Sequence, residues 1–159
     1  MGQECGLIYD NYFEKHDTGR GHPESPMRAT HVYKGLLQGN LLKSTSVLHP
    51  EPIEEIHLSL AHDPSYLAQA KRDIEDGLKT LTTGDTSVSK DSWSVALRAS
   101  GSACLAVKEL FSGKLTRAFC ASRPPGHHAT PSKGMGFCIF NHVALAARYA
   151  QKNMAWAKF

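Results

Sequence analysis

The chain has 159 residues, of which 41% are hydrophobic and 21% charged, a composition typical of one globular domain or less. No apolar run approaches the length of a membrane span, and no basic segment followed by an apolar stretch indicates a signal peptide. The four cysteines form no Cys-x-x-Cys pair, which argues against a zinc finger or a disulfide framework. We therefore expect small buried thiols in a reducing cytoplasm, and no membrane partner.

The charges are distributed unevenly along the chain. Residues 1–109 hold all 15 Asp and Glu, whereas residues 110–159 carry basic residues and no carboxylate, within a net charge of +3. A basic segment can bind nucleic acid, but these basic residues are spread singly and no aromatic residues alternate with them. We expect no direct nucleic-acid binding and interpret the imbalance as a lack of acidic residues.

The first third of the chain predicts a strand, a long loop and a helix. Residues 5–9 form a short apolar run with strand character. Residues 10–27 are polar and rich in Gly, Pro and His, which fits either a functional loop or a solvated connection. Apolar residues recur at helical spacing from Arg28 to Leu37, and Gly39-Asn40 ends that helix.

The middle of the chain continues this alternation. A second short strand is predicted at residues 44–48, followed by one or two helical turns at 53–59. Asp63 and Pro64 supply an N-cap and a first residue for a helix that reaches Ile74. His57 and His62 flank this region and read as surface or capping histidines.

The remaining elements complete an alternating pattern. A loop at residues 81–90 is followed by a long helix at 91–110 and a strand at 116–121. A further helix at 141–152 and the onset of another strand at 154–159 come last. The many small residues of the long helix predict close packing in the core. Strands that alternate with helices predict an α/β fold with a mostly parallel sheet. Sites in such sheets form at the carboxyl ends of the strands.

One stretch, Arg123-Pro-Pro-Gly-His-His-Ala129, has the character of a functional loop. Proline fixes φ, glycine tolerates crowded backbone positions, and rigid loops of this kind hold functional side chains. Two loop histidines can equally be satisfied by backbone carbonyls. Imidazole titrates with an unperturbed pKa of about 6.5, however, which suits proton transfer at neutral pH. His127 and His128 could therefore divide base and electrostatic roles, if each were oriented by a carboxylate.

RPPGHHA, followed by GFCIFN at residues 136–141 and an apolar helix, resembles the zinc-dependent histone deacetylase family, especially its class II and bacterial deacetylase-like branch. A second match, His22-Pro-Glu-Ser-Pro-Met-Arg28, fits the family's HPxxPxR pattern. The resemblance runs in order along nearly the whole chain. It implies a three-layer arginase/deacetylase-like α/β fold with a mostly parallel central sheet, in domains of roughly twice this length.

The resemblance also implies roles for individual residues. His128 would be the general base that takes a proton from a zinc-bound water, and His127 its electrostatic partner and the acid to the leaving amine. The other matched residues would contact substrate or product: Gly136 through its backbone, Phe137 as an aromatic wall, Cys138 near the acyl end, Arg28 beneath the pocket and Asp85 at its rim. A buried structural thiol is an equally good interpretation of Cys138.

In the order of family members, the zinc ligands and the carboxylates that orient the paired histidines come from a strand that would begin near Phe159. No Asp or Glu follows Glu109, so this chain supplies none of them. Residues 1–159 are expected to be the N-terminal part of a single deacetylase domain, truncated before its metal ligands. The Zn²⁺ that the resemblance implies has no ligand set here, so we expect this chain alone to be inactive and poorly stable.

Three functions stay open at this point. The first is a zinc amidohydrolase that removes acetyl or other acyl groups from lysine side chains of peptides or proteins. The second is a member of the same family that acts on acetylated polyamines or other small acylated amines. The third is a non-catalytic remnant, or a fragment that binds a partner. RPPGHHA does not discriminate between the first two, and the sequence indicates no oligomeric state.

Overall fold

A three-stranded parallel sheet lies at the centre of the molecule, in a computed structural model that describes residues 5–154. The strand order is β2–β1–β3, and Leu7 of β1 stands opposite Val47 of β2 and Phe119 of β3. The strands are β1 (Cys5–Ile8), β2 (Thr45–Leu48) and β3 (Arg117–Cys120). All three predicted strands and the α/β class are confirmed. The strand onset predicted at 154–159 lies almost entirely outside the described residues.

The α-helices also lie where the sequence predicts them, whereas the short 3₁₀ helices at 11–15 and 41–44 were not predicted. The α-helices are α1 (Arg28–Gln38), α2 (Pro64–Glu75), α3 (Ser92–Phe111) and α4 (His142–Asn153), and short 3₁₀ helices are η1 (Asn11–Lys15), η2 (Leu41–Ser44) and η3 (Glu55–Leu60). None of the helices in the described part of the chain is long and apolar enough to cross a membrane.

Local capping chemistry differs from the prediction at Asp63 and within the predicted loop at 10–27. Asp63 and Asp91 occupy N-cap positions, but neither carboxylate accepts a capping hydrogen bond. Asp10, in contrast, accepts the N–H of Tyr12 at 2.8 Å and starts η1 inside the predicted loop at 10–27. A side chain that accepts one orphan N–H is enough to begin a helical turn.

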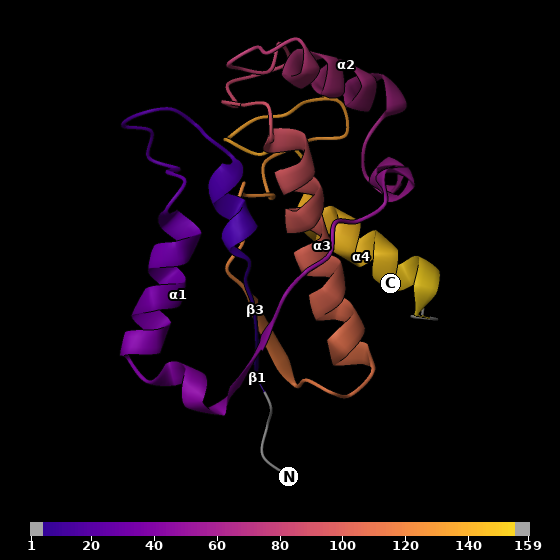
Figure 1. Cartoon of the computed structure of the whole chain (residues 1–159). Helices are drawn as coiled ribbons and strands as arrows, with labels where there is room; N and C mark the ends of the chain where they lie inside the picture. The colour runs from indigo at the N-terminus through magenta and orange to yellow at the C-terminus, as the bar shows by residue number, and fades with distance from the viewer. Residues whose placement is uncertain (1–4, 155–159) are drawn as a thin grey trace.

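The sheet is covered on both sides, which gives the expected three layers. Figure 1 shows α1 to one side of the strands and α3 with α4 to the other. α3 packs on α4 and on β3, so the longest helix lies between the sheet and the rest of that layer. Ala96 and Ala99 of α3 are fully buried, and a Cβ at Gly101 would overlap the carbonyl oxygen of Glu51. The close packing predicted from these small residues is confirmed.

The thiols behave as apolar side chains. All four cysteines are free; Cys104 and Cys138 are buried as predicted, whereas Cys5 and Cys120 are only half-buried. Burial raises the pKa of Cys104 and of Cys120 to about 11, so both are protonated at neutral pH. Inert, protonated thiols suit a packing role and not nucleophilic chemistry.

Two long loops leave the sheet at the same edge. Residues 9–27 follow the carboxyl end of β1, and residues 121–141 follow the carboxyl end of β3, its parallel neighbour. The segment with the paired histidines therefore has the position that the parallel order predicts for a site.

Candidate active site

His127 and His128 are exposed neighbours on the loop after β3. Their ring centroids lie 4.1 Å apart with the planes tilted by 46°. No carboxylate within residues 5–154 forms an ion pair or hydrogen bond with either ring. Two imidazoles at the carboxyl edge of the sheet can act on a proton, but the described residues do not supply the carboxylates that would orient them.

The entrance of the histidine loop is supported from below by His142, the first residue of α4. Its Nε2 lies 3.1 Å from the carbonyl oxygen of Pro124 and its Nδ1 lies 2.8 Å from the hydroxyl of Ser100. Because a carbonyl only accepts, Nε2–H donates to Pro124 and the Ser100 hydroxyl donates to Nδ1. A Cβ at Gly126 would overlap the ring of His142, so only glycine fits here. His142 and Ser100 were missed from the sequence, since neither belongs to a local motif.

Burial lowers the pKa of His142 to about 4, and the nearby His62 and His127 act in the same direction. Burial, reinforced by the charge of Arg123, similarly lowers the pKa of His16 to about 3. Both rings are therefore neutral at physiological pH. With the His142 ring neutral and Nε2–H donating to Pro124, Nδ1 is the acceptor of the Ser100 hydroxyl.

Acidification is expected to destabilise the fold before most carboxylates titrate. An unfolded histidine takes up a proton near its ordinary pKa of about 6.5, whereas folded His142 does so only near 4, so its stabilising contribution is complete above pH 6.5 and lost as pH falls toward 4. The loss approaches about 1.4 kcal/mol per pH unit for one such group. This loss of unfolding free energy is measured by denaturant unfolding between pH 7.5 and 4. The protein used is the product of the uninterrupted reading frame that contains residues 1–159, called the full-length protein below.

The matched control for this pH dependence is His142→Gln, whose amide can donate and accept but does not titrate. The variant should show a shallower fall of unfolding free energy over the same pH window, while carboxylate contributions stay common to both proteins. An identical slope in the two proteins would mean that His142 does not carry the effect.

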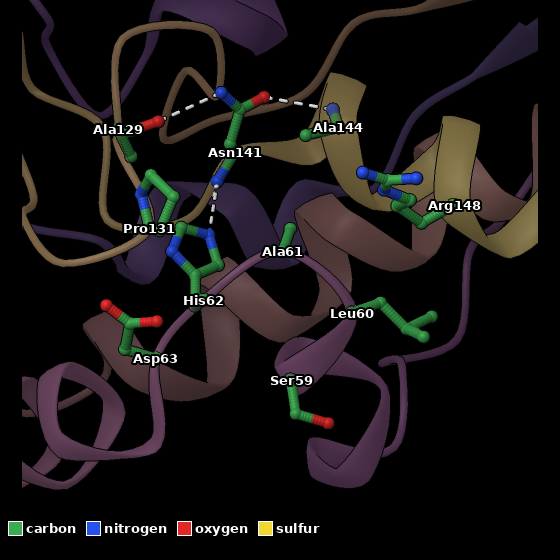
Figure 2. Close-up of a pocket in the computed structure, with 10 residues that line it drawn as sticks. All are labelled: Ser59, Leu60, Ala61, His62, Asp63, Ala129, Pro131, Asn141, Ala144 and Arg148. Atoms are coloured by element: carbon green, nitrogen blue, oxygen red, sulfur yellow. Dashed lines mark hydrogen bonds between the residues drawn. The ribbon is translucent and has the colours of Figure 1, made fainter.

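The exit of the histidine loop is held by His62 and Asn141, as Figure 2 shows. The Asn141 backbone N–H donates to His62 Nε2 at 2.9 Å, and its side-chain amide donates to the Ala129 carbonyl at 2.9 Å. The Asn141 side-chain oxygen accepts the N–H of Ala144 at 3.0 Å, so Asn141 caps α4. The interpretation of His62 as a surface histidine is wrong: it is buried, and burial lowers its pKa.

A hollow of about 370 Å³ lies behind this part of the loop, between η3 and α4. Its lining combines Asp63 and Arg148 with the small apolar side chains of Ala61, Ala129 and Ala144. Neither His127 nor His128 lines it. The hollow is therefore separate from the exposed face on which the paired histidines lie.

Gly136 and Asp85, both predicted substrate contacts, are brought together with His128. Asp85 Oδ1 accepts the N–H of Gly136 at 2.9 Å across 51 residues of sequence. Gly136 has φ +57°, and a Cβ there would lie 2.7 Å from the His128 ring. The glycine is thus needed both for its backbone conformation and for the space that the imidazole occupies.

Phe137 lies half-buried beside the same turn. It has a φ of +66°, an uncommon value for an aromatic residue, and its ring meets that of His22 at 4.6 Å in an edge contact. Cys138, the next residue, is fully buried with its thiol 3.4 Å from the carbonyl oxygen of Gly136. This position favours the interpretation of Cys138 as a structural thiol.

For Arg28, the predicted position beneath the substrate pocket stays a prediction. Its side chain is 45% exposed at the start of α1, and its Nε donates to Glu24 Oε1 at 3.2 Å. The arginine that is fully buried is Arg123, which also binds Glu24. Glu24 and Arg123 stand inside the two recognised motifs, but nothing local in the sequence indicates that they form a pair.

The described residues do not fit a zinc site. Within residues 5–154, no three His, Cys, Asp or Glu side chains converge in a way that could hold a metal ion. A catalytic zinc needs three protein ligands and an open position. The histidine pair alone does not meet that requirement.

Comparison with known proteins decides the family. The histone deacetylase domain matches residues 22–158. The chain belongs to the histone deacetylase domain family. The family match includes both motifs on which the resemblance was based, from His22 through the GFCIFN segment.

Individual members of the histone deacetylase family show the same relationship. Histone deacetylase 5 of Arabidopsis thaliana is 32% identical over 155 residues, which cover 92% of this chain and 24% of that protein. Histone deacetylase HDA1 of Saccharomyces cerevisiae is 30% identical, covering 92% of this chain and 23% of that protein. The chain therefore spans about a quarter of the length of these curated relatives.

The fold is likewise that of the family. The crystal structure of the HDA15 HD domain superposes with a TM-score of 0.85 at 24% sequence identity, covering 95% of this chain and 44% of that chain. The α/β deacetylase-like architecture expected from the resemblance is confirmed, over less than half of that solved domain.

Proposed function

We propose that this chain contributes the histidine-loop part of a deacetylase-type hydrolase that removes acetyl or other acyl groups from lysine side chains. The observation that carries the proposal is the exposed pair His127 and His128 at the carboxyl edge of the sheet, in contact with the Gly136 turn. His128 takes a proton from the water that attacks the amide carbonyl, and His127 gives a proton to the leaving amine.

The residues around the turn suit a substrate with a long aliphatic stem. Phe137 offers an aromatic wall for the methylene groups, and aromatic faces pack well against such chains. Asp85 stands at the same turn and supplies an exposed carboxylate beside the Gly136 backbone. Zn²⁺ is the proposed cofactor of the whole protein, with ligands outside the described residues, and we propose a cytoplasmic location.

The experiment compares two products of the same gene: the protein encoded by the uninterrupted reading frame that contains residues 1–159, and residues 1–159 alone. Each is assayed with an acetyl-lysine peptide and with an acetylated polyamine, with zinc and after treatment with a chelator. We expect zinc-dependent hydrolysis of the peptide by the longer product and none by residues 1–159.

The other outcomes identify the alternatives. Preference for the acetylated polyamine would replace the lysine substrate, and a stop codon directly after Phe159 with no turnover would indicate a non-catalytic protein. Zinc-dependent turnover by residues 1–159 alone would overturn the proposal that the metal ligands lie elsewhere. Residues 1–159 alone are expected to be poorly stable, because β3 exposes the apolar side chain of Phe119. Oligomer size and thermal unfolding of this shorter product test that expectation.

A further inference from the structure

Arg123 is a fully buried arginine whose hydrogen-bonding capacity is used completely. Its Nε and Nη2 donate to the two carboxylate oxygens of Glu24 at 3.0 and 2.8 Å. Nη1 donates to the carbonyl oxygens of Phe13 and His16, each at 2.6 Å, and Nη2 also donates to the Glu24 carbonyl at 3.2 Å. A bidentate ion pair of this kind fixes the orientation of the two side chains as well as the distance between them.

These partners all belong to the loop that follows β1, whereas Arg123 begins the loop that follows β3. Directly after it come Pro124, whose carbonyl is bound by His142, and then the paired histidines. The guanidinium therefore joins the two loops directly by hydrogen bonds at the carboxyl edge of the sheet.

The same connection continues to the substrate side of the site. The Glu24 backbone N–H donates to His22 Nδ1 at 3.0 Å, and the His22 ring packs against Phe137 at 4.6 Å. Thr18 additionally donates to the Glu24 carbonyl at 2.7 Å, which braces the turn that carries His22. Moving Glu24 would shift the ring that rests on Phe137.

We propose that Arg123 and Glu24 form a positioning clamp, which sets the loop after β1, whose His22 packs on Phe137, against the loop after β3 that carries Phe137, His127 and His128. Neither residue is a catalytic residue, because neither touches the face on which the histidine pair is exposed. The inference rests on the proposed hydrolase function for its kinetic consequence. Its structural consequence, the placement of His22 on Phe137, is independent of that function.

The clamp requires arginine in particular. Lysine carries a single ammonium with three donors and cannot form a two-pronged bond to a carboxylate while also reaching two further carbonyls. Arg123→Lys keeps the charge, so Glu24 retains a cation nearby, but the orientation is lost. Glu24→Gln keeps the size of the side chain but leaves the buried guanidinium without its counter-charge, so it is the more disruptive second test.

Arg98 is the matched control. It is also a largely buried arginine of several partners, donating to Asp10 Oδ2 at 2.9 Å and to the Pro50 carbonyl at 2.7 Å. It stands on α3 and reaches the loop after β1 only near its start, at Asp10 and Tyr12; it forms no ion pair or hydrogen bond with Glu24 or the histidine loop. Arg98→Lys should therefore lower stability without moving the site.

The kinetic test uses the full-length protein, well below the unfolding midpoint of each variant. We expect Arg123→Lys to lower kcat by about 10²-fold, the effect typical of a small misplacement of reacting groups. Glu24→Gln should lower kcat in the same direction, and Arg98→Lys should leave it unchanged. A general loss of stability would instead reduce the folded fraction of both arginine variants and spare kcat per folded molecule.

A second readout does not depend on activity. We expect the contact with Phe137 to give the His22 ring protons a distinct shift in proton NMR spectra, which the His22→Gln variant would assign. Arg123→Lys should abolish that shift and Arg98→Lys should preserve it, even in a protein without hydrolase activity. Wild-type kcat together with an unchanged His22 shift in Arg123→Lys would overturn the clamp; absence of turnover in the wild type alone would overturn only the proposed hydrolase.

Discussion

Replacing His128 by alanine in the full-length protein is expected to lower kcat for acetyl-lysine peptides by about 10²–10⁴-fold, the usual range for loss of a general base. The imidazole is exposed at the carboxyl edge of the sheet, touches the ring of His127 and lies over the Gly136 turn. Its removal takes away the group that is proposed to accept the proton of the attacking water. Because the ring is exposed, the unfolding midpoint should hardly change.

His31→Ala is the matched control, because it removes an exposed histidine side chain elsewhere in the chain. His31 is exposed on α1, outside the loops that leave the carboxyl edge of the sheet. Its removal should leave both kcat and stability unchanged. Normal kcat in His128→Ala, measured beside this control in a steady-state assay, would remove His128 from the proposed chemistry.

Gly126→Ala is expected to destabilise the full-length protein by about 1–3 kcal/mol, the usual cost of inserting atoms into a packed site. The added Cβ would overlap the ring of His142, which is buried and hydrogen-bonded at both nitrogens. The ring has no free direction in which to yield without losing a bond to Ser100 or Pro124. The histidine loop must therefore move instead, so kcat should fall as well.

Gly35→Ala provides a control of opposite sign. Gly35 lies within α1 with no atom within 4 Å of an added Cβ, and alanine in a helix interior is more stable than glycine by about 0.5–1 kcal/mol. Urea unfolding measures the change in unfolding free energy of both variants. A neutral or stabilising Gly126→Ala would show that the His142 ring does not hold the turn in solution.

Much of the local structure is determined by the sequence alone. Helical spacing from Arg28 to Leu37 and the short apolar runs before residues 10 and 49 mark elements whose bounds the structure confirms almost to the residue. Such patterns are local, because the period of apolar residues follows from the geometry of a helix or strand. The motifs RPPGHHA and GFCIFN likewise indicated the family, which the match over residues 22–158 confirms.

Only the tertiary structure shows which residues hold the histidine loop in place. His142 meets Ser100 across 42 residues, His62 meets Asn141 across 79, and Arg123 meets Glu24 across 99. The structure buries Arg123 completely and leaves Arg28, the arginine that the resemblance singled out, nearly half exposed. Local periodicity tells which face of an element is buried, but not which distant polar group will meet a buried charge. The partner depends on which strands are parallel neighbours, because the loops that follow such strands meet at one edge of the sheet. A buried guanidinium is stable only where one of those loops places a carboxylate beside it.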